Sequence, residues 1–273
     1  MRDLKIGFIG GGNMARALIR GLLDHGLPAG QIRVGEPLPA GREELRRLLG
    51  VATFADNATA AAGVQLLVLA VKPQQLAAAA ASLSAVLPRP GPVLLSIVGG
   101  VRTAALRSWL PGLPLVRAMP NRAALVGAGI TVLFANADVD REARALAEQA
   151  LAAAGRCVWV GEEALLDVVT AVSGSGPAYF FLLAEQLAAA GRALGLDEAT
   201  AQLLATETLI GAGKLAHADS NLAEQRAAVA SKGGTTEAAL KVLHDGGLAA
   251  LIDAAVAAAA RRSAELADEF GSP

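Results

Sequence analysis

Residues 8–18 read FIGGGNMARAL, and this stretch decides the fold of the first part of the chain. It places Gly10, Gly12 and Ala15 in the spacing G-x-G-x-x-A, after an apolar run and before a helical pattern. In such a turn the first glycine makes the bend, the second lets the backbone approach a pyrophosphate, and the small third residue allows the helix to pack closely on the strand. The stretch therefore predicts a dinucleotide-binding unit.

Apolar runs alternate with helical patterns from this turn to about residue 160. Residues 64–72, VQLLVLAVK, are almost entirely apolar, which is typical of a strand buried on both faces of a parallel sheet. Residues 39–50 and 140–155 have the spacing of helices, and each ends at a glycine. Strands separated by helices predict a doubly wound, mostly parallel sheet.

The pattern changes after residue 162, beyond which no strand-like run occurs. We therefore predict an α/β Rossmann-like domain over residues 1–162 and an all-α domain for dimerisation and substrate binding over residues 163–273. Two glycine-rich stretches interrupt the helical patterns. SGSGP at 173–177 predicts a helix stop and restart with Pro177 early in the new helix. SKGGTTEAAL at 231–240 predicts a helix with Thr235 or Thr236 as N-cap and free N–H groups suited to an anion.

Composition excludes several classes of protein. The 273 residues carry a net charge of −1, which argues against an electrostatic nucleic-acid binder. No run of ~20 apolar residues of membrane type and no signal peptide is evident, and the single cysteine, Cys157, forms no disulfide within the chain. A cytoplasmic protein without a metal site is expected. Hydrophobic residues make up 53% of the chain but aromatic residues only 3%, so alanine-rich helices are expected to bury themselves in a large interface.

The residue that ends the second predicted strand bears on the choice of dinucleotide. Glu36 is placed to accept hydrogen bonds from the ribose hydroxyls of NAD and to repel a 2′-phosphate, whereas Arg42 is placed to bind that phosphate. A third interpretation makes Arg33, Glu36 and Arg42 solvated surface charges. Both NADH and NADPH are therefore open at this point.

Two further polar residues have alternative interpretations. Lys72 follows the long buried strand, where ligands of open α/β sheets bind, and its alternative is a surface charge. Asn57 is either a ligand of the dinucleotide or a helix cap.

Six stretches together resemble the pyrroline-5-carboxylate reductase family in order and spacing. They are FIGGGNMARAL, LAVKPQ (69–74), RAMPN (117–121), GAGIT (127–131), SGSGPAY (173–179) and SKGGTT (231–236). The resemblance implies reduction of Δ1-pyrroline-5-carboxylate to L-proline with NADPH or NADH, the last step of proline biosynthesis. It also implies a homodimer, or a larger assembly of dimers, whose helical domains intertwine and whose substrate site lies across the dimer interface.

The resemblance also assigns site residues. Cofactor binding is implied for the following residues: Gly10, Gly12, Asn13, Met14, Glu36, Asn57, Ala70, Val71, Lys72, Pro73, Met119, Pro120 and Asn121. Substrate binding is implied for the following residues: Gly174, Ser175, Ser231, Gly233, Gly234, Thr235 and Thr236. Among these, Thr236 takes the catalytic place as the hydrogen-bond partner of the ring nitrogen.

Two positions depart from the family pattern. Lys232 replaces the usual proline, and it either loosens the loop or adds a cation near the substrate carboxylate. Arg122 replaces a common threonine, with a role toward the cofactor phosphate or none.

Two other functions are weighed against the reductase. A 3-hydroxyacid dehydrogenase needs a base, commonly lysine, on the helix after a glycine motif, but residues 177–187 read PAYFFLLAEQL and contain no lysine. A non-catalytic dinucleotide sensor would have no use for SGSGP and SKGGTT. By contrast, an imine needs mainly orientation and electrostatics, which fits a chain whose three histidines, His25, His217 and His244, lie outside the glycine motifs.

Overall fold

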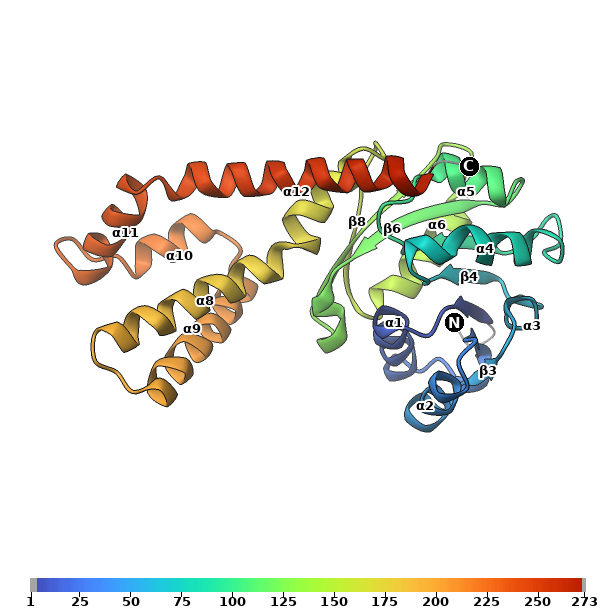
Figure 1. Cartoon of the computed structure of the whole chain (residues 1–273), viewed down its shortest axis with the longest axis horizontal. Helices are drawn as coiled ribbons and strands as arrows, with labels where there is room; N and C mark the ends of the chain where they lie inside the picture. The colour runs from blue at the N-terminus through green and yellow to red at the C-terminus, as the bar shows by residue number, and fades with distance from the viewer. Residues whose placement is uncertain (1–3, 272–273) are drawn as a thin grey trace. The chain divides into compact units, whose positions relative to one another are not determined.

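The computed structural model describes residues 4–271, and the chain divides into two compact units. The first unit reaches to Gly174 and resumes at Ala259, and the second is Ser175–Ala258. Figure 1 shows the elements of both units and labels most of them. The end of the last helix thus belongs to the first compact unit. The predicted domains, by contrast, divide the chain once, between residues 162 and 163, and that boundary stays a prediction.

An eight-stranded sheet of order β3-β2-β1-β4-β5-β6-β7-β8 organises the first unit. All neighbouring strands run parallel except β6 and β7, so the predicted mostly parallel α/β fold is confirmed. The order places β1 between β2 and β4, which brings the ends of these three strands together. The strands are β1 Ile6–Ile9, β2 Ile32–Gly35, β3 Ala52–Phe54, β4 Leu66–Leu69, β5 Val93–Ser96, β6 Leu115–Pro120, β7 Gly129–Ala135 and β8 Gly155–Trp159.

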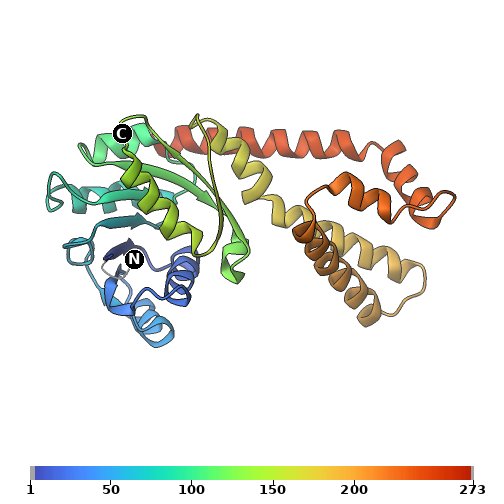
Figure 2. The ribbon, with the colours of Figure 1, turned by 180° about the vertical axis from the view of Figure 1, so that it is seen from behind.

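Helices cover both faces of this sheet. The buried residues of α1, α2 and α6 belong to one apolar cluster, and those of α3, α4 and α5 belong to a second cluster on the other face. In Figure 1 α4 lies in front of the sheet, and in Figure 2, seen from behind, α6 does. The helices are α1 Asn13–Asp24, α2 Pro39–Leu49, α3 Asn57–Ala61, α4 Pro73–Ser84, α5 Thr103–Trp109, α6 Arg141–Ala152 and α7 Leu165–Val169, with 3-10 turns at Ala29–Gln31 and Arg122–Val126.

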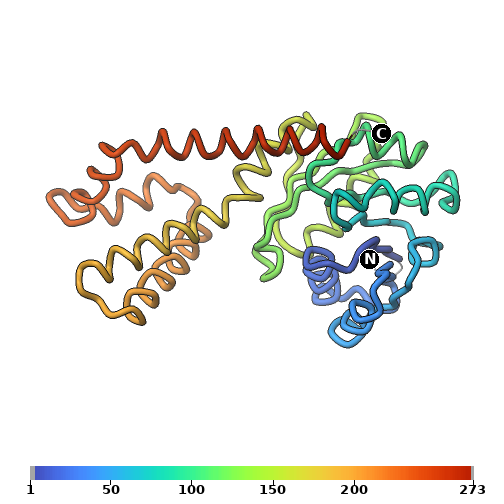
Figure 3. The backbone as a smooth tube through the Cα atoms, viewed as in Figure 1, coloured from blue at the N-terminus to red at the C-terminus, as the bar shows by residue number. Residues whose placement is uncertain are grey.

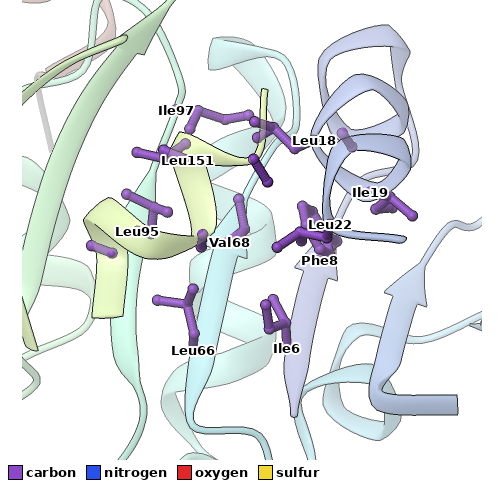
Figure 4. Close-up of a cluster of buried hydrophobic side chains, with 14 of the residues drawn as sticks. Ile6, Phe8, Leu18, Ile19, Leu22, Leu66, Val68, Leu95, Ile97 and Leu151 are labelled. Carbon is purple, nitrogen blue, oxygen red and sulfur yellow. The ribbon is translucent and has the colours of Figure 1, made fainter. Parts of the chain in front are cut away.

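Successive side chains along a strand point to opposite faces of the sheet, and those on one face form the first apolar cluster (Figure 4). Ile6 and Phe8 of β1 and Val68 of β4 point to the face on which Leu18 and Leu22 of α1 pack, and all five side chains are buried. The intervening Leu67 and Leu69 of β4 belong to the cluster on the opposite face. A strand with apolar residues at every position is therefore required at the centre of this sheet, as residues 64–72 predict.

The stretch SGSGP separates two helical elements, and Pro177 lies early in the new helix, so that prediction is confirmed. After α7, residues Thr170–Gly174 form a π-helical turn, and α8 begins at Gly176 with Pro177 in its first turn. The hydroxyls of Thr170 and Ser173 donate to the carbonyls four residues earlier, at 2.7 and 3.0 Å. Such bonds bend helices, and π turns concentrate at functional sites.

The second unit consists of helices, and the tube in Figure 3 shows their successive coils. Its apolar cluster of buried residues in the described chain is small: Ala188, Ala201 and Ala205. Most large apolar side chains of α8 and α9 are exposed, including Phe180 at 61% and Leu203 at 61%. Its helices are α8 Gly176–Ala193, α9 Glu198–Ala218, α10 Leu222–Ala228, α11 Thr235–Asp245 and the first part of α12 Leu248–Gly271.

The end of α12 packs on elements of the first unit. Ser263 donates to the Asp167 carboxylate of α7 at 2.7 Å, and both residues are buried. Leu266 and Phe270 lie against Gly100, whose φ of +72° suits glycine. These contacts explain why residues from Ala259 onward belong to the first unit.

Length and composition also give one candidate for a membrane-spanning helix. The helical segment Leu165–Ala193 is long and apolar enough to cross a membrane, and 22% of its apolar 18-residue stretch is buried within the chain. The bent pair Thr235–Asp245 and Leu248–Gly271 passes the same test when taken together. One or two such helices are weak evidence for a membrane protein, because helices at the core of soluble proteins have the same character.

Candidate functional site

The glycine turn between β1 and α1 has the geometry that its sequence predicts. Gly10 has a φ of +100°, and a Cβ atom there would lie 2.7 Å from the Ala70 carbonyl oxygen, so only glycine fits. Gly12 is the N-cap of α1, and a Cβ atom there would meet nothing within 4 Å. The turn therefore packs closely on β4 at Gly10 and leaves open space beside Gly12.

A cavity of about 810 Å³ lies beside this turn at the carboxyl ends of the strands. It has the position at which open α/β sheets bind ligands and a volume within the range of small-molecule and cofactor sites. Seven of the predicted cofactor residues line it: Gly10, Gly12, Glu36, Asn57, Ala70, Val71 and Lys72. The open space at Gly12 and the α1 N-terminus fit a dinucleotide with its pyrophosphate at the glycine turn.

Glu36 is held in place at the end of β2. Its carboxylate accepts hydrogen bonds from the Leu38 N–H at 3.0 Å and from the Gly11 N–H at 3.3 Å. The side chain also lies against Gly41, where a Cβ atom would come within 3.0 Å of the Glu36 Cγ. Glu36 is therefore a fixed group in the cavity wall and not a freely solvated surface charge.

Asp56, rather than Asn57, caps α3, so the interpretation of Asn57 as the cap was wrong. The Asp56 carboxylate accepts from the Thr59 N–H at 2.7 Å, and this hydrogen bond lowers the pKa of the carboxyl group. Asn57 is the first helical residue, and its amide nitrogen donates to the Ser82 hydroxyl at 3.2 Å on the cavity wall. An aspartate directly before the helix was the available sequence signal for the cap.

Lys72 and Pro73 form the step from β4 to α4. Lys72 is the N-cap residue of α4 and lines the cavity, and Pro73 is the first helical residue, a position that proline favours. The same helix contributes lining residues that the sequence did not reveal: Gln74, Gln75, Ala78, Ala79 and Ser82. Gln74 and Gln75 are polar residues in the first turn of the helix that follows the strand, and this was the signal that pointed to them.

The remaining predicted cofactor residues lie elsewhere in the first unit. Asn13 and Met14 belong to the first turn of α1, where Asn13 is exposed and Met14 packs on the apolar cluster. Met119 and Pro120 end β6, and Asn121 follows them. None of these residues, nor Pro73, is among the described residues that line the cavity.

Asn121 connects the end of β6 to the π-helical turn. Its amide nitrogen donates to the Ser173 carbonyl at 3.2 Å, and its amide oxygen accepts from the Ile130 N–H at 3.2 Å. Beside it, a Cβ atom on Gly174 would lie 2.9 Å from the Met119 methyl carbon. The structure thus brings Met119 and Asn121 together with Ser173 and Gly174.

The SKGGTT loop of the second unit forms a tight turn into α11. The Gly234 N–H donates to the Ser231 carbonyl at 2.9 Å, and Gly233 has a φ of +71°. Gly234 is the N-cap, and Thr235 and Thr236 are the first two helical residues, so the prediction of a threonine cap was wrong. The Glu237 carboxylate accepts from the Gly233 N–H at 2.7 Å. As at any helix start, the N–H groups of the first turn of α11 have no partners within the helix.

Other reactive residue types are poorly placed for chemistry. Burial and the nearby Glu148 carboxylate raise the pKa of the Cys157 thiol to about 11, which suppresses the thiolate. His25, His217 and His244 are exposed. Within residues 4–271, no group of three or more His, Cys, Asp or Glu side chains is arranged to hold a metal ion.

Known proteins resemble the chain along its whole length. A family model described as "Pyrroline-5-carboxylate reductase dimerisation" matches residues 163–266, and one described as "NADP oxidoreductase coenzyme F420-dependent" matches residues 5–100. A pyrroline-5-carboxylate reductase of Pseudomonas aeruginosa is 43% identical over 273 residues, covering 99% of this chain and 100% of the relative.

Solved structures agree with the sequence matches. A pyrroline-5-carboxylate reductase from Coxiella burnetii has a TM-score of 0.92 and 40% identity, covering 96% of this chain and 98% of that one. The Plasmodium falciparum pyrroline carboxylate reductase with NADP bound has a TM-score of 0.84 and 25% identity, covering 98% and 99% of the two chains.

Proposed function

The chain belongs to the pyrroline-5-carboxylate reductase family, and from that premise we propose which of its residues perform the family's reaction. The protein is an NAD(P)H-dependent oxidoreductase that reduces Δ1-pyrroline-5-carboxylate to L-proline, the last step of proline biosynthesis. The similarity of the chain to these reductases over nearly its full length supports this conclusion, because it spans both the dinucleotide-binding fold and the helical region.

The first part of the proposal concerns the cofactor. The cavity beside the glycine turn holds the dinucleotide, with the pyrophosphate at the N-terminus of α1 and the adenosine ribose near Glu36 and Asn57. Gly12 supports this placement because its missing side chain leaves space there. When bound, the reduced nicotinamide supplies the hydride that the substrate carbon accepts.

The second part concerns the substrate. Ser231 and Thr235 bind the carboxylate through the hydroxyl of the serine and the N–H groups of the first turn of α11, where the helix dipole favours an anion. Gly233 and Gly234 form the turn that presents these groups to the substrate. Gly174 and Ser175 line the same substrate. The tight turn at 231–234 supports this assignment, since a fixed loop presents its N–H groups without further ordering.

Thr236 takes the catalytic role through its hydroxyl. A C=N bond is activated by a proton or a hydrogen bond at nitrogen, so the residue that faces this nitrogen needs little acid strength. The exposed histidines and the elevated pKa of Cys157 support a mechanism in which orientation and hydrogen bonding carry the rate. Asn13, Met14, Pro73, Met119, Pro120 and Asn121 complete the proposed surroundings of the cofactor.

We further propose a cytoplasmic homodimer, alone or within larger assemblies, whose helical units cover each other's apolar side chains. The family model that matches residues 163–266 carries dimerisation in its description, which supports this proposal. The same apolar coverage accounts for the membrane-like composition of the segment Leu165–Ala193 without a bilayer.

Steady-state kinetics with Δ1-pyrroline-5-carboxylate and each of NADH and NADPH test the reaction. We expect oxidation of the dinucleotide that depends on the imine and yields proline in equal amount. Gly12→Val is the matched control, since its side chain fits the free protein but blocks the pyrophosphate position. Turnover of a 3-hydroxyacid with NAD⁺, and none of the imine, would instead support the dehydrogenase alternative.

A further inference from the structure

The charges around the adenosine end of the cavity favour one dinucleotide over the other. We propose that this enzyme prefers NADH to NADPH and that Glu36 is the residue that sets the preference. The inference rests on the proposed placement of the cofactor in the cavity beside the glycine turn. It selects between two alternatives that the sequence leaves open.

The first argument is the fixed position of the Glu36 carboxylate. Its two oxygens accept from the N–H groups of Leu38 and Gly11, and Gly11 belongs to the glycine turn itself. The carboxylate therefore lies between the turn and the end of β2, where the adenosine ribose of a dinucleotide is bound in this fold. A carboxylate there accepts hydrogen bonds from the ribose hydroxyls and repels a 2′-phosphate.

The second argument is the balance of charge along the cavity wall. Among the described lining residues, the charged side chains are Glu36, Asp56 and Lys72. Asp56 follows β3, which is next to β2, and the hydrogen bond from the Thr59 N–H keeps its pKa low, so the group is ionised. Lys72 follows β4, and since β1 separates β4 from β2, two strand spacings of about 5 Å each lie between them. The ribose end thus faces two carboxylates, with the lysine farther away.

The third argument is that other groups of the protein hold the nearby guanidinium groups. Arg42 donates from one nitrogen to the Glu36 and Pro37 carbonyls at 2.8 and 2.7 Å. Arg33 stacks over the Phe54 ring at 4.4 Å and donates to the Thr59 carbonyl at 2.6 Å.

Arg16 is also held by other groups of the protein. It donates to the Gly11 carbonyl at 2.9 Å and pairs with Glu44 at 2.8 Å. None of the three arginines is among the described residues that line the cavity, so a 2′-phosphate would meet carboxylates without a guanidinium partner.

Calorimetric titration with NAD⁺ and NADP⁺ tests the preference without relying on turnover. We expect NAD⁺ to bind the wild-type protein at least about tenfold more tightly, a modest effect for like charges near a protein surface. The ratio of kcat/KM for NADH and NADPH should move in the same direction. Tighter binding of NADP⁺ than of NAD⁺ would overturn the proposal.

Substitutions locate the cause. Glu36→Gln should lower the NAD⁺-to-NADP⁺ preference by about tenfold, mainly by improving NADP⁺ binding. Asp56→Asn removes a charge while asparagine keeps the helix cap, and it should shift the preference in the same direction by less. Glu43→Gln removes an exposed carboxylate of α2 outside the cavity and should leave the preference unchanged.

Two results would contradict the assignment of Glu36. One is an unchanged preference in Glu36→Gln, and the other is a selective loss of NADP⁺ binding in Arg42→Ala, which would make Arg42 a phosphate ligand. Failure of the proposed reaction is distinguishable from either, since it would abolish imine reduction with both dinucleotides and leave the calorimetric ratio intact.

Discussion

Thr236 lies at the second position of α11, directly after the turn that Gly233 and Gly234 form. Thr236→Ala removes the hydroxyl proposed to face the ring nitrogen, and removing one such donor typically slows a reaction by about 10²–10³-fold. We expect kcat for imine reduction to fall within or just below that range, with unchanged binding of the dinucleotide. Thr236→Ser keeps the hydroxyl and should restore most of the rate; equal loss in both variants would assign Thr236 a packing role.

Lys232 is the residue at which the loop departs from its family, and the turn explains why it is tolerated. It is the second residue of a four-residue turn closed by the Gly234 N–H and the Ser231 carbonyl, and the third residue, Gly233, has a φ of +71°. Among the described residues only glycines have a positive φ, so the φ of Lys232 is negative. A negative φ at the second position and a positive φ at the third form the pattern of a type II turn, which accepts proline at its second position without requiring it.

Lys232→Pro should therefore stabilise the protein. Where the native backbone suits proline, the gain in the free energy of unfolding is about 0.4–1 kcal/mol, because the unfolded chain loses freedom. Denaturant unfolding measures it, and Lys232→Ala is the control for loss of the charge. Destabilisation by proline alone would show that the Lys232 backbone is incompatible with the turn assigned here.

At the scale of elements, the π-helical turn Thr170–Gly174 is positioned by a side chain of another element. Asn121 is buried, with 9% exposure, and joins the Ser173 carbonyl to the Ile130 N–H of β7. We therefore expect Asn121 to act mainly by positioning the turn that leads into Gly174 and Ser175, in addition to any contact with the cofactor.

Asn121→Asp separates the two hydrogen bonds. It keeps an acceptor for the Ile130 N–H but loses the donor to Ser173, whereas Asn121→Ala loses both. The KM for the imine should rise roughly fivefold in Asn121→Asp, as loss of one hydrogen bond of about 1 kcal/mol predicts. NAD(P)⁺ affinity measured by calorimetry should change far less. An equal loss of dinucleotide affinity would assign Asn121 to the cofactor instead.

The same elements show what a sequence reveals and what it does not. Residues 64–72 predicted a central strand because burial on both faces demands apolar residues at every position. By contrast, β3 has three residues at the sheet edge, too few for a periodic pattern. The π-helical form of the turn at Thr170–Gly174 was not predictable from SGSGP, because it depends on two hydroxyls that donate to carbonyls four residues earlier within the helix.

In the candidate site, too, some features could be predicted from the sequence and others could not. Gly10 of the first turn was predictable, because only glycine satisfies a φ of +100° against a neighbouring carbonyl. The engagement of Arg42 by the Glu36 and Pro37 carbonyls was not, because it depends on the turn between β2 and α2. Because these carbonyls hold Arg42, the proposal assigns the choice of dinucleotide to Glu36.

At the scale of the whole molecule, the second unit has too little core to be stable alone. Its cluster of buried apolar residues in the described chain consists of three alanines, whereas Phe180, Phe181 and Leu183 of α8 are more than half exposed. A helix that is apolar on all sides is normally buried on all sides. Since burying a large apolar side chain contributes about 1.5–3 kcal/mol, the proposed association with a second copy would supply stability that one chain lacks.

Light scattering should therefore find a particle of at least twice the mass of one chain. The midpoint of thermal unfolding should rise with protein concentration, because association favours the folded state by mass action. Phe181→Glu places a charge on α8 and should produce monomers or loss of helical structure. Val86→Glu is the matched control, since Val86 of the first unit has the same 52% exposure. An active wild-type monomer, or a Phe181→Glu dimer of unchanged stability, would show that the apolar face of α8 has another purpose.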